Sequence, residues 1–328
     1  MDIKKRYHIV PEMKFYDQIT CDYKPFVMFF NKQNFKSEIV NTDELGFRLN
    51  LFDNILKKQS DFFNSDEISI IIGGSLVFGF GATSDKKTIS SILSKKTKQT
   101  FLNFGATAFN STQELLLFLN FFQNFKKIKK VIIISGANDL YLNLTNTNDN
   151  WGNFFFKEKF EKIHNFYRYR KNYKKKIKNL FLKFLKNKKK IINSKPINFN
   201  QLDLDYKKIL ILWSSLAKNY NFDLHFYLQP FSSWIEKPLS IKENELFKIL
   251  DNSDDRAHLI LKEISSLENY KHFSNILQNR TKENGINLID LNTELKKSKN
   301  LDKSLFVDRV HMNDLGYEEI SNIILNNI

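Results

Sequence analysis

The sequence predicts an α/β protein with three layers, in which helices cover both faces of a parallel sheet. Two observations predict this fold. Short apolar runs rich in β-branched residues recur along the chain, as expected for buried strands. Stretches with the apolar spacing of helices separate several of these runs. Strands that alternate with helices form right-handed βαβ units, which build a parallel sheet covered on both sides.

Five strands are predicted, over residues 68–72, 100–104, 130–134, 223–228 and 286–291. Helices are predicted over residues 111–125, 205–220 and 315–325, and another begins at 88–93. Ser111 with Glu114 three residues later predicts a capping box, and Asn313 or Asp314 is expected to cap the last helix. Residues 55–63 read as a short helix. Five strands connected in this way predict a flavodoxin-like three-layer α/β/α sandwich with a five-stranded parallel sheet.

The chain of 328 residues is long enough for one large domain or two ordinary ones. We expect residues 1–67 to be an N-terminal extension packed on the core. Residues 68–328 then form the main domain, with helical inserts at about 140–200 and 231–284. Both inserts leave the sheet at its carboxyl end, so we expect them to select the substrate.

The positive charge of the chain is concentrated in residues 157–195. This segment holds 16 Lys and Arg against two Glu, and so carries nearly all of the net charge of +15. Its apolar residues recur at spacings of three and four, which predicts one or two amphipathic helices. Two interpretations stay open. The segment is a solvated lysine face whose apolar stripe packs on the domain, or it binds an anionic partner such as the inner membrane surface or an acidic glycan. No recognised module supports a nucleic-acid partner.

Other features exclude several classes of protein. Cys21 is the only cysteine, so neither a disulfide framework nor a thiolate zinc site is expected. The first residues lack the apolar stretch of a secretion signal, and no apolar run is long enough to span a membrane. We therefore expect a cytoplasmic protein, peripheral to the inner membrane if the basic segment binds lipid. Gly79 and Gly81 lack the third glycine of a dinucleotide site, and no phosphate-binding loop or zinc-ligand spacing occurs, so no cofactor or metal is expected.

Chemically capable residues follow four of the predicted strands, at the edge where parallel sheets place their ligands. Ser75 follows Gly73 and Gly74 after the first strand, and is either a nucleophile or a helix N-cap. Gly105 and Asn138 follow the second and third strands. With the N–H of Ser75, they are expected to stabilise an oxyanion. Gln229 follows the fourth strand and is predicted to bind substrate.

A carboxylate and an imidazole, Asp308 and His311, stand three residues apart between the fifth strand and the last helix. This spacing lets the carboxylate reach one ring nitrogen, while the other takes a proton from Ser75. Asp255 and His258 have the same spacing. They lie in a polar helical stretch with no strand before them, so Asp308 and His311 are favoured.

Four blocks, in order, resemble those of the SGNH/GDSL hydrolase superfamily. They are G-G-S ending at Ser75, N-F-G-A-T around Gly105, G-A-N-D from Gly136, and D-R-V-H ending at His311. The resemblance implies that Ser75 is the nucleophile and that Asp308 and His311 activate it. It also implies that Gly105 and Asn138 complete the oxyanion hole. The chain departs from the family at Gly74, which replaces the usual Asp of G-D-S.

The expected function is that of a serine esterase acting on an O-acyl ester, with O-acetyl on a carbohydrate as the favoured substrate. The carbohydrate rests on analogy, because the G-G-S form resembles bacterial members that accompany surface-glycan pathways. Two alternatives stay open. An O-acyltransferase would use the same acyl-enzyme, and a non-catalytic module would bind glycan or membrane through its basic segment.

Overall fold

The computed structural model describes residues 3–145, 154–157, 160, 162, 196–253 and 255–328. Residues 1–141 and 199–328 form one compact unit, and residues 142–198 form another. Most of the basic segment 157–195, with its predicted amphipathic helices, lies outside the described residues. Among the helices that are described, none is long and apolar enough to cross a bilayer.

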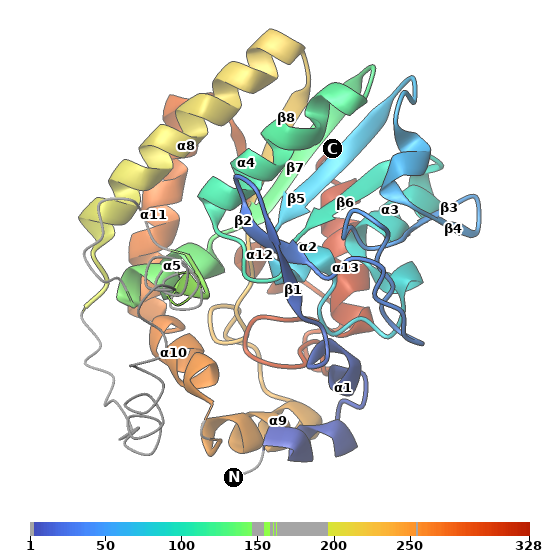
Figure 1. Ribbon diagram of the computed structural model, residues 1–328. Helices are drawn as coiled ribbons and strands as arrows, with labels where there is room; N and C mark the ends of the chain where they lie inside the picture. The colour runs from blue at the N-terminus through green and yellow to red at the C-terminus, as the bar shows by residue number, and fades with distance from the viewer. Residues whose placement is uncertain (1–2, 146–153, 158–159, 161, 163–195, 254) are drawn as a thin grey trace, which may run out of the picture. The chain divides into compact units, whose positions relative to one another are not determined.

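A five-stranded parallel sheet forms the centre of the larger unit (Figure 1). Its strands are β5 (Ile68–Gly73), β6 (Phe101–Gly105), β7 (Ile128–Ser135), β8 (Asp223–Leu228) and β9 (Asn287–Asp290). They lie in the order β6-β5-β7-β8-β9, and every neighbouring pair is parallel. The first of these five strands in the sequence, β5, therefore lies inside the sheet, with β6 on one side and β7, β8 and β9 on the other. The predicted fold class is confirmed, and this strand order is that of flavodoxin-like folds.

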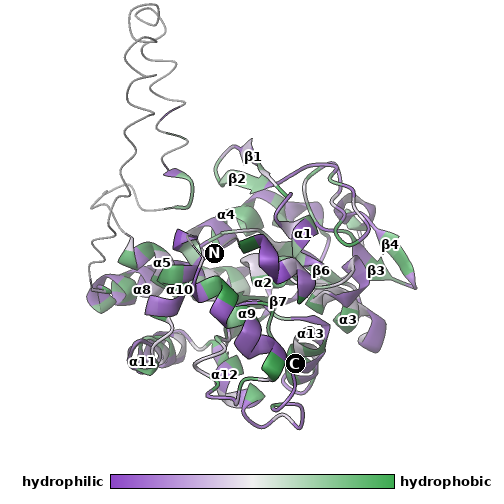
Figure 2. Cartoon of the chain, turned by 90° about the horizontal axis from the view of Figure 1, so that it is seen from below, coloured by the Kyte–Doolittle hydropathy of each residue, from purple (hydrophilic) through white to green (hydrophobic). Residues whose placement is uncertain are grey.

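Helices cover both faces of the sheet because its strands are apolar on both sides. Helices α3 (Ile89–Thr97) and α13 (Asp314–Leu325) cover one face, where Ile71 and Ile132 share a core with Leu93 and Ile320. Helices α4 (Ser111–Phe121) and α8 (Phe199–Tyr220) cover the other face and meet through aromatic side chains. The remaining helices after β8 are α9 (Ile241–Asp251), α10 (Arg256–Ile264), α11 (Leu267–Glu283) and α12 (Leu291–Leu295). Hydrophilic and hydrophobic stretches lie side by side on α8 and α9, as expected for helices with one buried face (Figure 2).

Residues 3–62 form short elements that pack on this core. They are η1 (Ile3–His8), α1 (Met13–Tyr16), β1 (Cys21–Lys24), β2 (Met28–Asn31), β3 (Asn50–Phe52), β4 (Ile55–Lys57) and η2 (Gln59–Phe62). The helix predicted over 55–63 is wrong in its first half, because β4 pairs with β3 in an antiparallel hairpin. Asp53 and Asn54 make the turn with left-handed φ angles of 48° and 64°. Left-handed angles at both central residues are those of a tight hairpin turn.

The cap predicted for α4 also differs from the observed one. Asn110, not Ser111, is the N-cap: its side chain accepts from the N–H of Gln113, and the Gln113 side chain accepts from the N–H of Asn110. The helix ends at Phe121 and is followed by a short 3-10 turn, η4 (Phe122–Asn124). Ser111 and Glu114 are buried and bond elsewhere. At α13, Asn313 is the cap, which is one of the two alternatives predicted.

Candidate active site

Ser75 is the first residue of α2 (Ser75–Phe78), a single turn that follows β5 directly. The turn lies so close to the sheet that glycine is required around it. A Cβ on Gly73 would lie 2.2 Å from the carbonyl oxygen of Ile134, and one on Gly105 would lie 2.0 Å from the backbone nitrogen of Phe78. The glycines thus let α2 sit directly on the ends of the neighbouring strands. This close packing places Ser75 at the carboxyl edge of the sheet, where the sequence predicts it.

Asp308 and His311 lie in a hairpin-like loop, residues 305–313, which we call the His311 loop. A bridge joins Phe306 to Met312, and the N–H of Val307 donates to the carbonyl of His311 at 2.9 Å. Oδ1 of Asp308 accepts the backbone N–H groups of Val310 and His311, at 2.9 and 2.8 Å. The loop therefore fixes the carboxylate by one oxygen and leaves the other free for the imidazole.

The three side chains form a continuous hydrogen-bonded chain. Oδ2 of Asp308 lies 2.6 Å from Nδ1 of His311, and Nε2 of His311 lies 2.6 Å from Oγ of Ser75. Burial by itself would raise the pKa of the Asp308 carboxyl, but the charge and hydrogen bond of His311 hold it well below its ordinary range. An ionised Asp308 accepts the Nδ1 proton and leaves Nε2 able to accept the proton of Ser75. This geometry is what activation of a serine nucleophile requires.

Asn138 lies at the start of α5 (Ala137–Leu144), directly after β7. Its Nδ2 donates to the carbonyl of Phe109 at 2.6 Å. The same nitrogen would lie 2.8 Å from a Cβ on Gly74, so the amide approaches the residue before Ser75. An amide nitrogen carries two hydrogens, and the second remains for a ligand. The missing side chain at position 74 therefore gives the Asn138 amide room beside Ser75.

Gly105 does not fit the oxyanion role expected of it. Its N–H donates to Oδ1 of Asn103 at 2.9 Å, and its carbonyl accepts from Asn31 at 3.0 Å. Ala108, three residues further along the same loop, has a left-handed φ of 63°, and within the described part of the chain its N–H has no acceptor. Sequence reasoning missed this residue because alanine carries no signal for a left-handed conformation, whereas glycine does.

Gln229 is only 4% exposed, which leaves little of it for the substrate contact predicted. Its Nε2 donates to the carbonyl of Val310 at 3.3 Å, and its backbone N–H donates to Ser135 at 3.0 Å. Gln229 thus joins the His311 loop to the end of β7. The structure gives it a supporting contact instead of a binding surface.

The second Asp–His pair does not form the corresponding contact. Asp255 is the N-cap of α10 and accepts from the N–H of Ala257 at 2.8 Å. Nε2 of His258 lies 3.5 Å from Nη1 of Arg6, and its Nδ1 is buried with no partner in the described residues. Burial lowers the pKa of His258, against the opposing effect of the Asp308 charge. His258 is therefore an electrostatic neighbour of Asp308.

Two further carboxyl groups, those of Asp139 and Glu114, lie behind the site. Asp139 accepts from Oγ of Ser111 at 2.7 Å and from the Tyr206 hydroxyl at 3.1 Å. Burial raises its pKa to about 6. Burial likewise raises the pKa of Glu114, whose Oε1 accepts from Ser135 at 2.9 Å. Because Asp139 follows Asn138 in α5, its bonds anchor the turn that carries the Asn138 amide.

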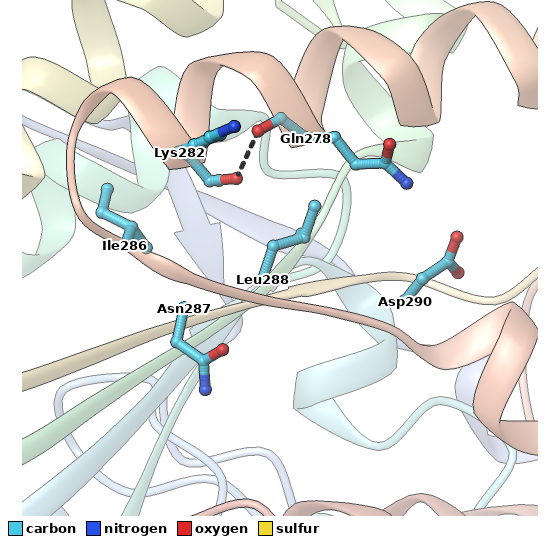
Figure 3. A pocket seen from close by; sticks show the side chains of 7 residues that line it. Gln278, Lys282, Ile286, Asn287, Leu288 and Asp290 are labelled. Atoms are coloured by element: carbon cyan, nitrogen blue, oxygen red, sulfur yellow. Dashed lines mark hydrogen bonds between the residues drawn. The ribbon is translucent and has the colours of Figure 1, made fainter.

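A pocket of about 340 Å³ lies away from these residues, between the end of α11 and the edge strand β9 (Figure 3). Polar side chains line most of it, among them Gln278, Lys282 and Asp290. Across the described ranges, no group of three or more His, Cys, Asp or Glu side chains is placed to hold a metal ion.

Comparisons with known proteins give a likeness of fold. No protein-family model and no curated protein matches the chain. Similar solved structures include a lipolytic G-D-S-L family member from Veillonella parvula, with a TM-score of 0.43 and 14% identity over 80% of this chain and 98% of that one. The lipase/acylhydrolase from Enterococcus faecalis has a TM-score of 0.45 and 10% identity, over 80% of this chain and 95% of that one. The acetyl xylan esterase AlAXEase has a TM-score of 0.43 and 14% identity, over 80% of this chain and 99% of that one.

Proposed function

We propose that the protein is a serine esterase that cleaves O-acyl esters. The observation that carries this proposal is the chain of contacts from Ser75 through His311 to Asp308, with 2.6 Å at each of its two links. A helix-capping serine would not require an imidazole on its hydroxyl, nor a buried carboxylate behind that imidazole. The order of the four sequence blocks gives independent support.

In the proposed first step, Oγ of Ser75 attacks the ester carbonyl carbon while Nε2 of His311 takes the hydroxyl proton. Asp308 holds the imidazole and stabilises its protonated form. The tetrahedral intermediate collapses, the alcohol leaves with the proton from His311, and the acyl group stays on Ser75. Water then attacks the acyl-enzyme, His311 takes a proton from it, and the carboxylic acid is released as Ser75 regains its proton.

The negative oxygen of each tetrahedral intermediate needs donors that are fixed before the reaction. We assign this role to the N–H of Ser75, the free amide hydrogen of Asn138 and the N–H of Ala108, which replaces Gly105. The contact of Asn138 with the carbonyl of Phe109, the residue after Ala108, supports placing these two donors in one group. For the substrate we propose an O-acetyl group on a carbohydrate, on the strength of the sequence blocks.

A fluorophosphonate tests the nucleophile, because it reacts with an activated serine. We expect wild-type protein to be labelled at Ser75 and to release acid from acetylated sugars or short p-nitrophenyl esters. Ser75→Ala should lose labelling and should lower turnover by about 10⁶, the loss seen when a triad acts as a unit. Wild-type turnover in this variant would refute the mechanism. If acyl groups move to an added sugar instead of water, the acyl-enzyme serves a transferase.

A further inference from the structure

One buried guanidinium, that of Arg48, connects the N-terminal part of the chain to the carboxyl end of α2, the turn that begins at Ser75. Arg48 is fully buried, and its Nε donates to Oδ1 of Asp85 at 2.8 Å. Its Nη1 donates to the carbonyls of Phe78 and Gly79, at 3.0 and 2.8 Å. Nη2 donates to the carbonyl of Ile39 at 3.1 Å. All three nitrogens of the guanidinium are therefore used.

Two of these acceptors end the turn that Ser75 begins. The last carbonyls of a helix have no partner within it, and a positive charge is favourable there. In α2, which is a single turn, the carbonyls of Phe78 and Gly79 lie only three and four residues from Ser75. A cap on them restrains the whole turn, so Arg48 and Ser75 act at opposite ends of one rigid unit.

The residues after this turn carry the restraint on to the imidazole. The ring of Phe80 lies 4.6 Å from the ring of Tyr16 on one side and 4.6 Å from the ring of His311 on the other, between centroids. The Tyr16 hydroxyl lies 2.7 Å from the carbonyl oxygens of both Gly79 and Ala82, which share its single hydrogen, and it accepts from Nη1 of Arg48 at 3.0 Å. Residues 78–82, which place Phe80 against His311, are thus held by the side chains of Arg48 and Tyr16.

We propose that Arg48, together with Tyr16, is a positioning residue that keeps Ser75 and His311 in register for proton transfer. The proposal rests on the esterase function proposed above and gives the N-terminal extension a part in that reaction. Arg48 touches neither substrate nor reacting atoms. Its fork meets several acceptors in fixed directions, which the single ammonium of a lysine cannot do.

The test compares Arg48→Lys with wild type in the full-length chain. The lysine keeps a positive charge near Asp85 but loses the fork to the turn. Because a misplacement of about 1 Å can cost about 10²-fold, we expect kcat to fall about 10- to 100-fold. KM for a p-nitrophenyl ester should stay within about twofold, since the buried side chain has no substrate contact. The rate of fluorophosphonate labelling should fall in parallel with kcat. Each rate is divided by the amount of Ser75 that the fluorophosphonate labels at completion, and is measured well below the melting temperature of each protein.

Leu277→Ala is the matched control, because Leu277 is fully buried in α11 and its truncation lowers stability without touching α2. It should melt earlier than wild type and keep its kcat. Tyr16→Phe keeps the ring on Phe80, removes the bonds to Gly79 and Ala82, and should lower kcat about 3- to 10-fold on the same reasoning. If Arg48→Lys does not fold, the kcat of Tyr16→Phe tests the positioning role in its place.

An unchanged kcat per reactive serine in Arg48→Lys, or in Tyr16→Phe where it replaces that variant, would overturn the positioning role while leaving the esterase intact. A wild-type protein that neither reacts with the fluorophosphonate nor releases acid would instead refute the proposed function itself.

Discussion

The chain contains two Asp-x-x-His pairs of equal spacing, and only one of them forms an Asp–His contact. In the His311 loop, Asp308 accepts two backbone N–H groups with one oxygen and turns the other to His311. At the start of α10, Asp255 uses its side chain to cap the helix, and His258 lies toward Arg6.

Spacing alone therefore does not bring an aspartate and a histidine into contact. A helical start offers a carboxylate unpaired N–H groups of the helix itself, and capping them is favourable. A hairpin-like loop saturates one oxygen with its own backbone and leaves the second directed at the imidazole. The position after the last strand of the sheet then decides whether that imidazole can reach Ser75.

The largest effect is expected at the two histidines. His311→Ala should lower turnover about 10⁶-fold, as much as loss of the nucleophile, because the members of a triad act as a unit. His258→Ala should leave turnover nearly unchanged. Acyl release is measured for both variants with the same ester. The reverse result would mean that the His258 pair performs the proton transfer.

The next effect separates the two aspartates. Asp308→Asn should lower kcat by about 10⁴, because the amide favours the wrong imidazole tautomer while the geometry persists. Asp255→Asn should keep both activity and stability, since asparagine caps a helix as well as aspartate does. Steady-state kinetics and thermal unfolding of both variants give the comparison. Equal losses of kcat would remove the distinction between the pairs.

A smaller effect is expected beside the triad, at Asn138. Asn138→Ala should lower kcat by about 10² to 10³, the cost of one oxyanion donor, with a smaller change in KM. Asn143→Ala, at the other end of α5, is the control and should keep its activity. A loss confined to KM would show that the Asn138 amide binds the ground state of the substrate and not the developing charge.

The smallest effect concerns stability, and contrasts the carboxyl of Asp139 with that of Asp308. The folded pKa of Asp139 is raised to about 6, above its ordinary value of 3.8. The contribution of Asp139 to the free energy of unfolding is therefore fully present below about pH 4 and is lost as the pH rises through about 6. The lowered pKa of Asp308 acts in the opposite sense, because its contribution is present above pH 3.8 and is lost in acid.

Urea unfolding between pH 4 and pH 7 measures the Asp139 effect. Relative to Asp139→Asn, wild-type protein should lose free energy of unfolding as the pH rises. Asp66→Asn, which removes an exposed ion pair with Lys126, should show no such difference. A wild type that gains stability relative to Asp139→Asn across this range would contradict the raised pKa.

The sheet was predicted well from the sequence because each buried parallel strand has a local pattern, a β-branched run that ends at glycine or polar residues. Residues 223–228 were placed with the observed bounds, and the other four strands to within two residues. Ser75, Asp308 and His311 were predicted to meet because each combines suitable chemistry with a position at the end of a strand, and the structure brings them into contact.

The remainder depends on contacts that no local pattern encodes. Arg48 reads as an ordinary surface cation, since arginine is rarely buried, and only the fold brings it to the carbonyls of α2. The left-handed Ala108 has no residue preference to reveal it. The β3–β4 hairpin, in contrast, carried a readable sign, because Asp53 and Asn54 are residue types that tolerate left-handed angles.

The contact between Ser75 and His311 joins residues 236 positions apart in the chain. Contacts between partners far apart in the chain require loop closure before they stabilise the fold, so we expect this contact to form late. The site has no precursor within any contiguous fragment of the fold, since β5 supplies one partner and the loop after β9 the other. If the proposed esterase function holds, activity should return after the helical signal during refolding, and its return would then report the final step of assembly.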